Sequence, residues 1–131
     1  MFARPIRHVL IAAAILSTNA IASHDAIAHQ RGVASYYSHS FHGRQMANGE
    51  RFSIHSDSAA HRHLPFGTRV RVTNLTNGRV AYVVIRDRGP FVHRRIIDLS
   101  PRTASDLDMR HRGLAPVRLE VIRFVEVAQA R

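Results

Sequence analysis

Hydrophobic and polar residues alternate most clearly in the middle of the chain. Within residues 68–75, Val70 and Val72 alternate with arginine and threonine, which is the period of a strand with one buried face. Residues 79–86 are almost continuously apolar, as is typical of a strand buried on both faces. Between them lies Thr76-Asn77-Gly78, and Asn-Gly favours a tight turn because both residues tolerate a positive φ. The pattern therefore predicts a β-hairpin.

Weaker patterns on either side of this hairpin predict further short strands. Residues 32–38 are rich in β-branched and aromatic side chains, residues 95–99 are apolar apart from the arginine and the aspartate, and residues 115–127 alternate again. Several short strands without an internal repeat are typical of a closed β-barrel that occupies one domain. The expected fold class is therefore mainly β.

Two helical segments and one long loop complete this prediction. Ser100-Pro101 favours a helix start, because serine caps a helix and proline suits its first turn; we expect this helix to end near residue 109. Residues 56–61 fit a single helical turn, capped by serine or aspartate. Residues 39–53 are rich in glycine, asparagine, histidine and serine, which predicts a loop long enough to be functional.

The first 22 residues have the features of a secretory signal peptide. Arg4 and Arg7 precede an apolar run over residues 9–16, and Ala20-Ile21-Ala22 fits a small-x-small cleavage site. This run is much shorter than the roughly 20 residues that span a bilayer, so no transmembrane segment is expected. A second small-x-small triplet, at residues 26–28, leaves the cleavage position open. We predict a signal at 1–22, a flexible lead-in at 23–31 and a barrel domain at 32–127.

Charge and cysteine content narrow the choice of partners and compartment. All 19 basic residues are arginines, against nine acids, and the formal net charge is +10. Such a field favours polyanions, and export favours anionic lipid headgroups or acidic envelope polymers over nucleic acid. Scattered arginines also fit an ordinary solvated surface. Because the chain has no cysteine, we expect neither disulfides nor lipid attachment. We also predict that the protein is a monomer exported to the periplasm or cell envelope.

A few polar residues are placed where chemistry is possible. Asp87 ends an apolar strand between two arginines, and Asp98 interrupts another apolar strand. Glu50 lies in the long loop, and His61 ends the predicted helical turn. Each also has a structural explanation: an ion pair for Asp87, a helix cap for Asp98 and plain solvation for Glu50. Since no histidine pair has metal-site spacing beside an acid, neither a metal nor a cofactor is expected.

Eight short motifs follow one another along the chain. They are Gly32-Val33-Ala34-Ser35-Tyr36-Tyr37, Phe41-His42-Gly43-Arg44, Ala47-Asn48-Gly49-Glu50, Ala59-Ala60-His61-Arg62-His63-Leu64-Pro65-Phe66-Gly67-Thr68, Val70-Arg71-Val72-Thr73-Asn74-Leu75, Asn77-Gly78-Arg79, Asp87-Arg88-Gly89-Pro90-Phe91 and Arg95-Ile96-Ile97-Asp98-Leu99-Ser100. In order and spacing this series resembles the rare lipoprotein A family of septal lytic transglycosylases. The resemblance runs from about Gly32 to Ile122.

The resemblance implies a six-stranded double-psi β-barrel with one or two short helices, whose groove holds a peptidoglycan glycan strand. It implies cleavage of the MurNAc–GlcNAc bond without water, which leaves a 1,6-anhydro end. The matching catalytic positions are Glu50, His61 and Asp87, and similar barrels place a working aspartate at the position of Asp98. We expect Asp87 to be the acid/base, with Asp98 as its rival, and the other two to orient the sugar or tune the acid.

The same motifs suggest residues that contact the substrate, and one of them departs from the family. These residues are Tyr37, Asn48, Ser53, Arg88 and Phe91. The direction in which Arg88 points is left open. The family commonly has an acid at the position of Ser53, and a serine carries no charge there. A non-catalytic, expansin-like peptidoglycan-binding module and a general polyanion-binding protein therefore remain alternatives to the lytic transglycosylase.

Overall fold

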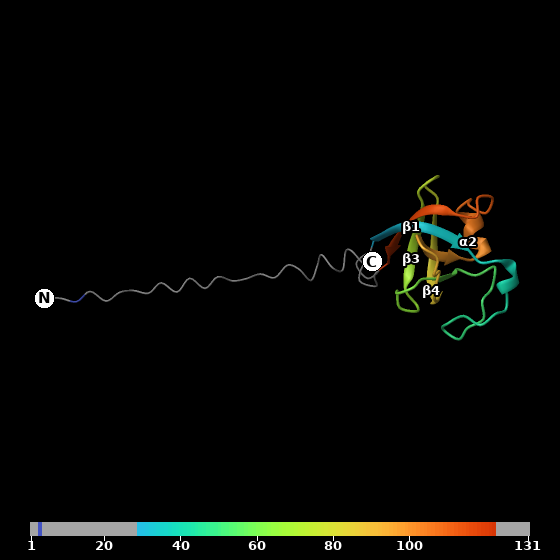
Figure 1. Cartoon of the computed structure of the whole chain (residues 1–131), viewed down its shortest axis with the longest axis horizontal. Helices are drawn as coiled ribbons and strands as arrows, with labels where there is room; N and C mark the ends of the chain where they lie inside the picture. The colour runs from blue at the N-terminus through green and yellow to red at the C-terminus, as the bar shows by residue number, and fades with distance from the viewer. Residues whose placement is uncertain (1–2, 4–28, 123–131) are drawn as a thin grey trace, which may run out of the picture.

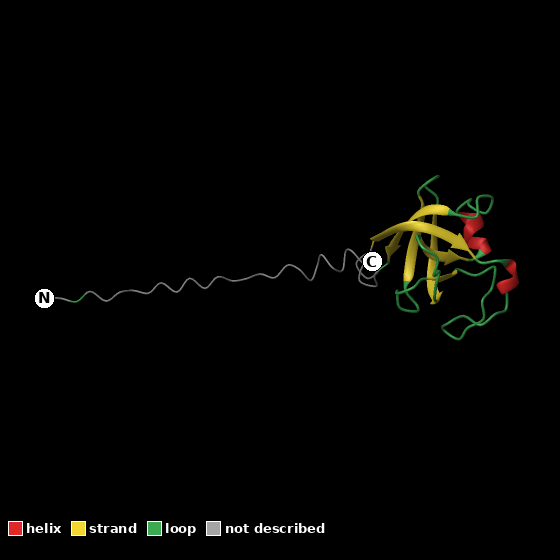
Figure 2. Ribbon diagram, viewed as in Figure 1, coloured by secondary structure: helices red, strands yellow, loops and turns green. Residues whose placement is uncertain are grey.

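The computed structural model describes residue 3 and residues 29–122, and the latter form a closed barrel of six strands (Figures 1 and 2). Around the barrel the strand order is β1-β5-β2-β4-β3-β6. The elements are β1 (His29–Tyr36), η1 (His39–Phe41), β2 (Ser58–Ala60), β3 (Arg69–Asn74), β4 (Val80–Asp87), β5 (Arg95–Leu99), α2 (Pro101–Asp106) and β6 (Ala115–Val121). The predicted mainly β barrel is confirmed. The predicted signal at 1–22, apart from residue 3, and residues 123–127 lie outside the described residues.

The predicted hairpin is formed by β3 and β4, which pair antiparallel with Val72 opposite Ala81. One prediction about it is wrong, because β4 is not buried on both faces: Val83 is buried, whereas the neighbouring Tyr82 is 58% exposed. In the turn, Gly78 has a φ of 79°, whereas Asn77 does not have a positive φ. The hairpin thus has an inner face packed in the core and an outer face open to solvent.

The first strand begins three residues earlier than the sequence pattern indicates. His29 pairs with Glu120 of β6, and Arg31 pairs with Arg118, so residues 29–31 belong to β1 and not to the lead-in. The side chains of residues 29–31 are polar and give no alternation of apolar positions, so the sequence pattern does not indicate this part of the strand. Farther along β1, a Cβ added at Gly32 would come within 2.6 Å of the Ile96 side chain. Glycine therefore lets β1 lie close to β5.

The predicted helical turn at 56–61 is wrong, because residues 58–60 form the short strand β2. This strand pairs parallel with β4 and antiparallel with β5. Ala59 and Ala60 are almost fully buried between those neighbours. Alanine favours a helix locally, but the pairing on both sides of the segment overrides this weak preference.

Helix α2 begins where predicted and ends about three residues early. Ser100 caps it, with its hydroxyl accepting the Thr103 backbone N–H at 3.2 Å. Asp108 adopts a left-handed conformation with φ of 52°, which cannot continue an α-helix. The Met109 N–H instead bonds back to the Ala104 carbonyl. The chain therefore turns towards β6 immediately after the helix.

The core fills the barrel with aliphatic side chains from all six strands and from the segment around α2. Its largest fully buried apolar members are Ile85, Ile97, Leu99, Leu107, Met109, Leu119, Val70, Val72, Val83 and Val117. Helices in the described part of the chain are all too short or too polar to cross a membrane.

The pairing of the strands brings two of the candidate carboxylates into one row. Ser35 of β1 pairs with Asp98 of β5, Asp98 pairs with Ala60 of β2, and Ala60 pairs with Asp87 of β4. Since neighbouring strands lie about 4.8 Å apart, the two aspartates are only two strand spacings from each other. Residues separated by 11 positions in sequence therefore meet at one end of the barrel.

Candidate active site

A groove of about 380 Å³ opens over this row of residues. Both Asp87 and Asp98 line it, together with Ser35 and Tyr37 from the end of β1. Its remaining lining comes mainly from the segment after β4, which includes the exposed Phe91 and Val92. Two carboxylates thus lie beside apolar and aromatic side chains, which is an arrangement that suits a sugar ring.

Asp87 is held by three hydrogen bonds from three parts of the chain. The Tyr37 hydroxyl donates to Oδ2 at 2.5 Å, and the backbone N–H groups of Ala47 and Arg88 both donate to Oδ1 at 2.9 Å. One of these donors lies in the long loop, so that loop is tied directly to the carboxylate. The side chain is therefore fixed in position before any substrate binds.

Asp98 has a different environment from Asp87. Its Oδ1 accepts a hydrogen bond from the Ser35 hydroxyl. Burial raises the pKa of Asp98, the Ser35 hydrogen bond and Arg95 lower it, and the negative charge of Asp87 raises it. A raised pKa is what a carboxylic acid needs in order to hold a proton near neutral pH.

Tyr37 links the aspartates to an aromatic cluster. Burial, followed by its hydrogen bond to Asp87, raises the pKa of Tyr37, so its phenol stays protonated and donates. Its ring packs against Phe52 at 4.4 Å and Phe41 at 5.6 Å between centroids. Phe52 is buried, while Phe41 also lines the groove.

Arg88, whose direction the sequence left open, extends its guanidinium away from the neighbouring carboxylate. Its Nη1 donates to the backbone carbonyls of His61 at 3.2 Å and Leu64 at 2.9 Å. The guanidinium carbon lies 4.0 Å from the centroid of the Phe66 ring, a cation–π contact. Arg88 still lines the groove, but its charged end ties the segment after β4 to residues 61–66.

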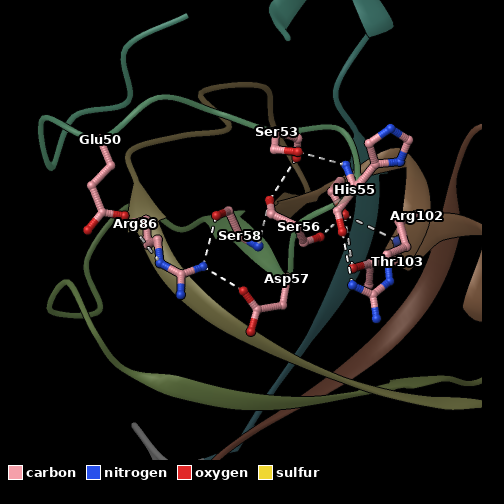
Figure 3. Close-up of polar contacts among 10 residues, drawn as sticks. Glu50, Ser53, His55, Ser56, Asp57, Ser58, Arg86, Arg102 and Thr103 are labelled. Atoms are coloured by element: carbon pink, nitrogen blue, oxygen red, sulfur yellow. Dashed lines mark hydrogen bonds and ion pairs between the residues drawn. The ribbon is translucent and has the colours of Figure 1, made fainter. Parts of the chain in front are cut away.

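Glu50 is not among the residues that line the groove. Its side chain is 65% exposed and lies 3.6 Å from Arg86, whose Nη1 also contacts Asp57 at 2.6 Å and Ser58 at 2.9 Å (Figure 3). The structure therefore does not bring Glu50 together with Asp87 and Asp98. The loop that carries it does reach Asp87, through the Ala47 N–H.

His61 lies close to Asp87 in the backbone, but its ring serves the fold. The Nδ1 atom accepts the backbone N–H groups of His63 and Leu64, at 3.0 and 3.1 Å. The Nε2 atom lies 2.9 Å from Gln30 Oε1, so it donates there. Burial lowers the pKa of His61 to about 4, which keeps the ring neutral. Both nitrogens are thus engaged within the protein, and the ring does not line the groove.

Asn48 and Ser53 also use their side chains within the loop. The Asn48 Oδ1 accepts the Glu50 N–H at 2.9 Å, and the Ser53 hydroxyl oxygen accepts the His55 N–H at 3.2 Å (Figure 3). Neither residue lines the groove. Of the five expected substrate contacts, the groove includes Tyr37, Arg88 and Phe91.

Ser35 is the main site residue that the sequence analysis missed. It is buried and its hydroxyl donates to Asp98. A signal was present, because Ser35 lies in the first of the eight motifs and is a polar residue inside a predicted strand. Its partner, 63 residues away, is visible only once β1 and β5 are paired. Groups of three histidine or acidic side chains that could hold a metal ion do not occur among residues 29–122.

Comparison with known proteins agrees with this geometry. A family described as lytic transglycolase matches residues 29–119. The chain is 53% identical over 93 residues to the endolytic peptidoglycan transglycosylase RlpA of Campylobacter jejuni, covering 71% of this chain and 34% of that protein. A probable RlpA of Synechocystis is 51% identical over 92 residues, covering 70% and 29%. The chain therefore spans about a third of these relatives.

Solved structures support the barrel type. The Streptomyces papain inhibitor superposes with a TM-score of 0.58 at 26% identity, over 72% of this chain and 94% of that one. An expansin of Clavibacter michiganensis superposes with a TM-score of 0.57 at 20% identity, over 73% and 51%. The expected double-psi β-barrel is confirmed. With a groove built on paired aspartates and a family match that covers nearly the whole described chain, this protein belongs to the lytic transglycolase family, together with the RlpA endolytic peptidoglycan transglycosylases.

Proposed function

We propose that the protein is an endolytic peptidoglycan lytic transglycosylase, which cleaves the MurNAc–GlcNAc bond and leaves a 1,6-anhydro-MurNAc end. The observation that carries this proposal is the placement of Asp87 and Asp98 in one row beneath an open groove. Both residues pair with Ala60 of β2, from its two sides. The identity to RlpA proteins, above 50% over the barrel, supports the same reaction.

The groove supports a glycan as the ligand. Phe41 and Phe91 offer apolar ring faces on which sugar rings pack, and Phe91 is 78% exposed. The hydroxyl groups of Ser35 and Tyr37 are both directed at carboxylates. The sugar hydroxyls therefore meet hydrogen-bonding groups at the row of aspartates and aromatic faces along the rim.

Asp87 serves as the acid/base in this proposal. Its carboxyl group gives a proton to the glycosidic oxygen as the bond from that oxygen to C1 breaks. The carboxylate then takes the proton of the C6 hydroxyl as the C6 oxygen bonds to C1. This regenerates the acid and consumes no water, in contrast to an inverting hydrolase. The three hydrogen bonds to Asp87 support this role, because they hold the transferring group in place.

One observation favours Asp98 as the acid instead. Burial raises the pKa of Asp98, and the nearby charge of Asp87 raises it as well. The negative charge of Asp87 opposes a second charge in the same site, which favours a proton on Asp98. In this second assignment Asp98 holds the proton at neutral pH and Asp87 stabilises the positive charge that develops on the sugar.

Glu50 and His61 act as positioning residues in the same proposal. Glu50 anchors the long loop to Arg86, and that loop supplies the Ala47 N–H to Asp87. The His61 ring accepts a backbone N–H within its own turn, and the His61 carbonyl accepts a hydrogen bond from the Arg88 guanidinium. Asn48 and Ser53 support the loop through hydrogen bonds within its own turns.

A non-catalytic, expansin-like peptidoglycan-binding module is the second candidate. It is favoured by the serine at position 53 and by the exposed ion pair of Glu50 with Arg86. On either assignment we propose a monomer that acts in the periplasm or cell envelope, without a lipid anchor or cofactor. The formal charge of +10 favours anionic components of the envelope over nucleic acid as further partners.

Digestion of purified peptidoglycan with the purified chain tests this function, with mass spectrometry of the soluble products. We expect fragments with 1,6-anhydro ends, and none from Asp87→Asn that still binds the polymer. Reducing ends would assign a hydrolase to the same groove. Sedimentation of the protein with peptidoglycan, without any soluble fragment, would establish the binding module and contradict the enzyme.

A further inference from the structure

The outer face of β3 and β6 carries a basic surface distinct from the groove. Residues that pair directly across antiparallel strands point to the same side. Arg31 therefore lies beside Arg118, Arg118 beside Thr73, and Arg71 between Glu120 and Tyr82. We name this surface the arginine face, and it consists of Arg31, Arg69, Arg71, Thr73, Tyr82, Arg118 and Glu120.

The charge of this face is strongly unbalanced. Four arginines and one glutamate leave a formal charge of +3. Glu120 is occupied by Arg118, whose Nε lies 2.9 Å from its Oε1. Arg31, Arg69 and Arg71 form none of the side-chain ion pairs found among residues 29–122. Three cationic side chains are thus available on rigid strands of a closed barrel.

Two polar atoms on this face also lack a hydrogen-bond partner. Among the described residues, the two buried side-chain atoms without a partner are Arg71 Nε and Thr73 Oγ1. They are two residues apart on β3 and point to the same side of the sheet. Buried donors without acceptors are costly, so an anionic oxygen that entered between these side chains would be stabilised.

The arginine face and the groove share no residue. In the strand order of the barrel, β3 is diametrically opposite β5, and β6 is opposite β2. None of the residues that line the groove belongs to β3 or β6. A partner on the arginine face therefore leaves the row of aspartates free.

We propose that the arginine face docks the domain on a surface of anionic phospholipid headgroups, with the residues of the groove left free of that contact. Guanidinium groups bind phosphate oxygens through paired hydrogen bonds. Tyr82, 58% exposed beside Arg71, has the apolar ring and polar hydroxyl that suit a headgroup layer. The outer face of strands in a closed barrel curves outwards, which suits an extended surface better than a single polymer chain held in a groove.

Co-sedimentation of the purified chain with vesicles tests this proposal. Vesicles of equal parts phosphatidylglycerol and phosphatidylcholine are compared with vesicles of phosphatidylcholine alone. The test variant is Arg31→Gln/Arg69→Gln/Arg71→Gln, which leaves the Arg118–Glu120 pair intact. The matched control is Arg102→Gln/Arg110→Gln/Arg112→Gln, which removes the same charge from exposed sites in and after α2. Both variants keep the same terminal segments, so any contribution from those segments cancels.

We expect the test variant to lose at least about tenfold in binding to the anionic vesicles, because each arginine near such a surface contributes about fivefold. The control should lose less than about threefold. The single variant Arg69→Gln, at an exposed site, keeps the test valid if the triple variant folds poorly, and it should lose about fivefold. Equal losses in both triple variants would overturn the proposal. The proposal would also be overturned if the wild type did not bind vesicles but bound soluble polyphosphate, and only the test variant lost that binding. This result would assign the arginine face to a polymer.

Discussion

The protein contains two clusters of paired carboxylates, and they differ in every property that matters for chemistry. Asp87 and Asp98 lie in the groove and receive hydrogen bonds from hydroxyl and backbone donors, and the charge of Asp87 raises the pKa of Asp98. Glu50 and Asp57 lie on the surface, 65% and 51% exposed, and share Arg86 (Figure 3). Water screens the second cluster, so its ion pairs contribute little. The lesson is that residue type alone does not identify an acid, because burial is what raises the pKa of Asp98 most.

The largest expected effect separates the two clusters directly. Asp87→Asn should lower the rate of peptidoglycan cleavage by about a thousandfold, because general acid–base groups typically contribute between a hundredfold and ten-thousandfold. Product formation, followed by mass spectrometry, measures this. The variant should unfold at the same urea concentration as the wild type within error. If cleavage persists at the wild-type rate, Asp87 is not the acid, and Asp98→Asn becomes the decisive variant.

A buried histidine extends the comparison from activity to stability. His61 has a pKa of about 4 in the folded protein against 6.5 when unfolded, so the unfolded chain binds more protons between these values. The contribution of His61 to the free energy of unfolding is therefore full above pH 6.5 and falls by about 3 kcal/mol as the pH drops to 4.

Urea unfolding at pH 7 and pH 4.5 measures this contribution. His61→Gln should be less stable at pH 7 and should lose less stability than the wild type on acidification. The exposed His93→Gln is the matched control, because His93 is not among the groups that shift the pKa of His61, and it should follow the wild type. An equal acid loss in His61→Gln and wild type would show that the ring does not titrate as its burial implies.

The hydroxyl donors sharpen the comparison within the groove. Ser35→Ala removes the hydrogen bond that lowers the pKa of Asp98, so that pKa should rise further. If Asp98 is the acid that holds the proton, the alkaline limb of the pH–rate profile should move to higher pH; if Asp98 must be charged, the acid limb should move to higher pH, with a loss of about tenfold near that limb. Tyr37→Phe should lower kcat by a similar factor and leave KM nearly unchanged, since its ring contacts remain. An unmoved profile in Ser35→Ala would remove Asp98 from the reaction.

The smallest effect is expected at the exposed cluster. Glu50→Gln should lower cleavage by no more than about fivefold, because a solvent-exposed ion pair contributes between roughly 0 and 1 kcal/mol. Asp57→Asn, which breaks the other ion pair of Arg86, serves as the control at a similarly exposed site. A loss at Glu50 as large as that at Asp87 would contradict the comparison. It would mean that the loop carries Glu50 into the groove when substrate binds.

The sequence predicts the regular parts of the fold well and the short or polar parts poorly. The β3–β4 hairpin follows from the alternation in β3, where each buried valine has polar neighbours, and from the Asn77-Gly78 turn. Strand β2 does not, because three residues are held by pairing partners that lie 26 to 40 positions away. The early start of β1 is hidden for a similar reason, since its polar residues are ordered by β6.

The residues of the candidate site also fall into a group that the sequence could predict and a group that it could not. Asp87 and Asp98 could be located because each interrupts or ends an apolar strand, and strand ends meet at one edge of a barrel. Glu50 and His61 rest on the resemblance alone, and the structure engages their side chains in a surface ion pair and a buried turn. Ser35 could not be assigned, because only the pairing of β1 with β5 reveals its contact with Asp98.

The closed ring of strands has a consequence for how the protein withstands its surroundings. Every strand from β1 to β6 has neighbours on both sides, so the described barrel offers no free edge on which another chain could add a strand and begin aggregation. The chain also has no cysteine, so oxidants and reductants have no thiol or disulfide to attack. Its fold therefore does not depend on a thiol–disulfide balance, and the experiments above require no control of thiol chemistry.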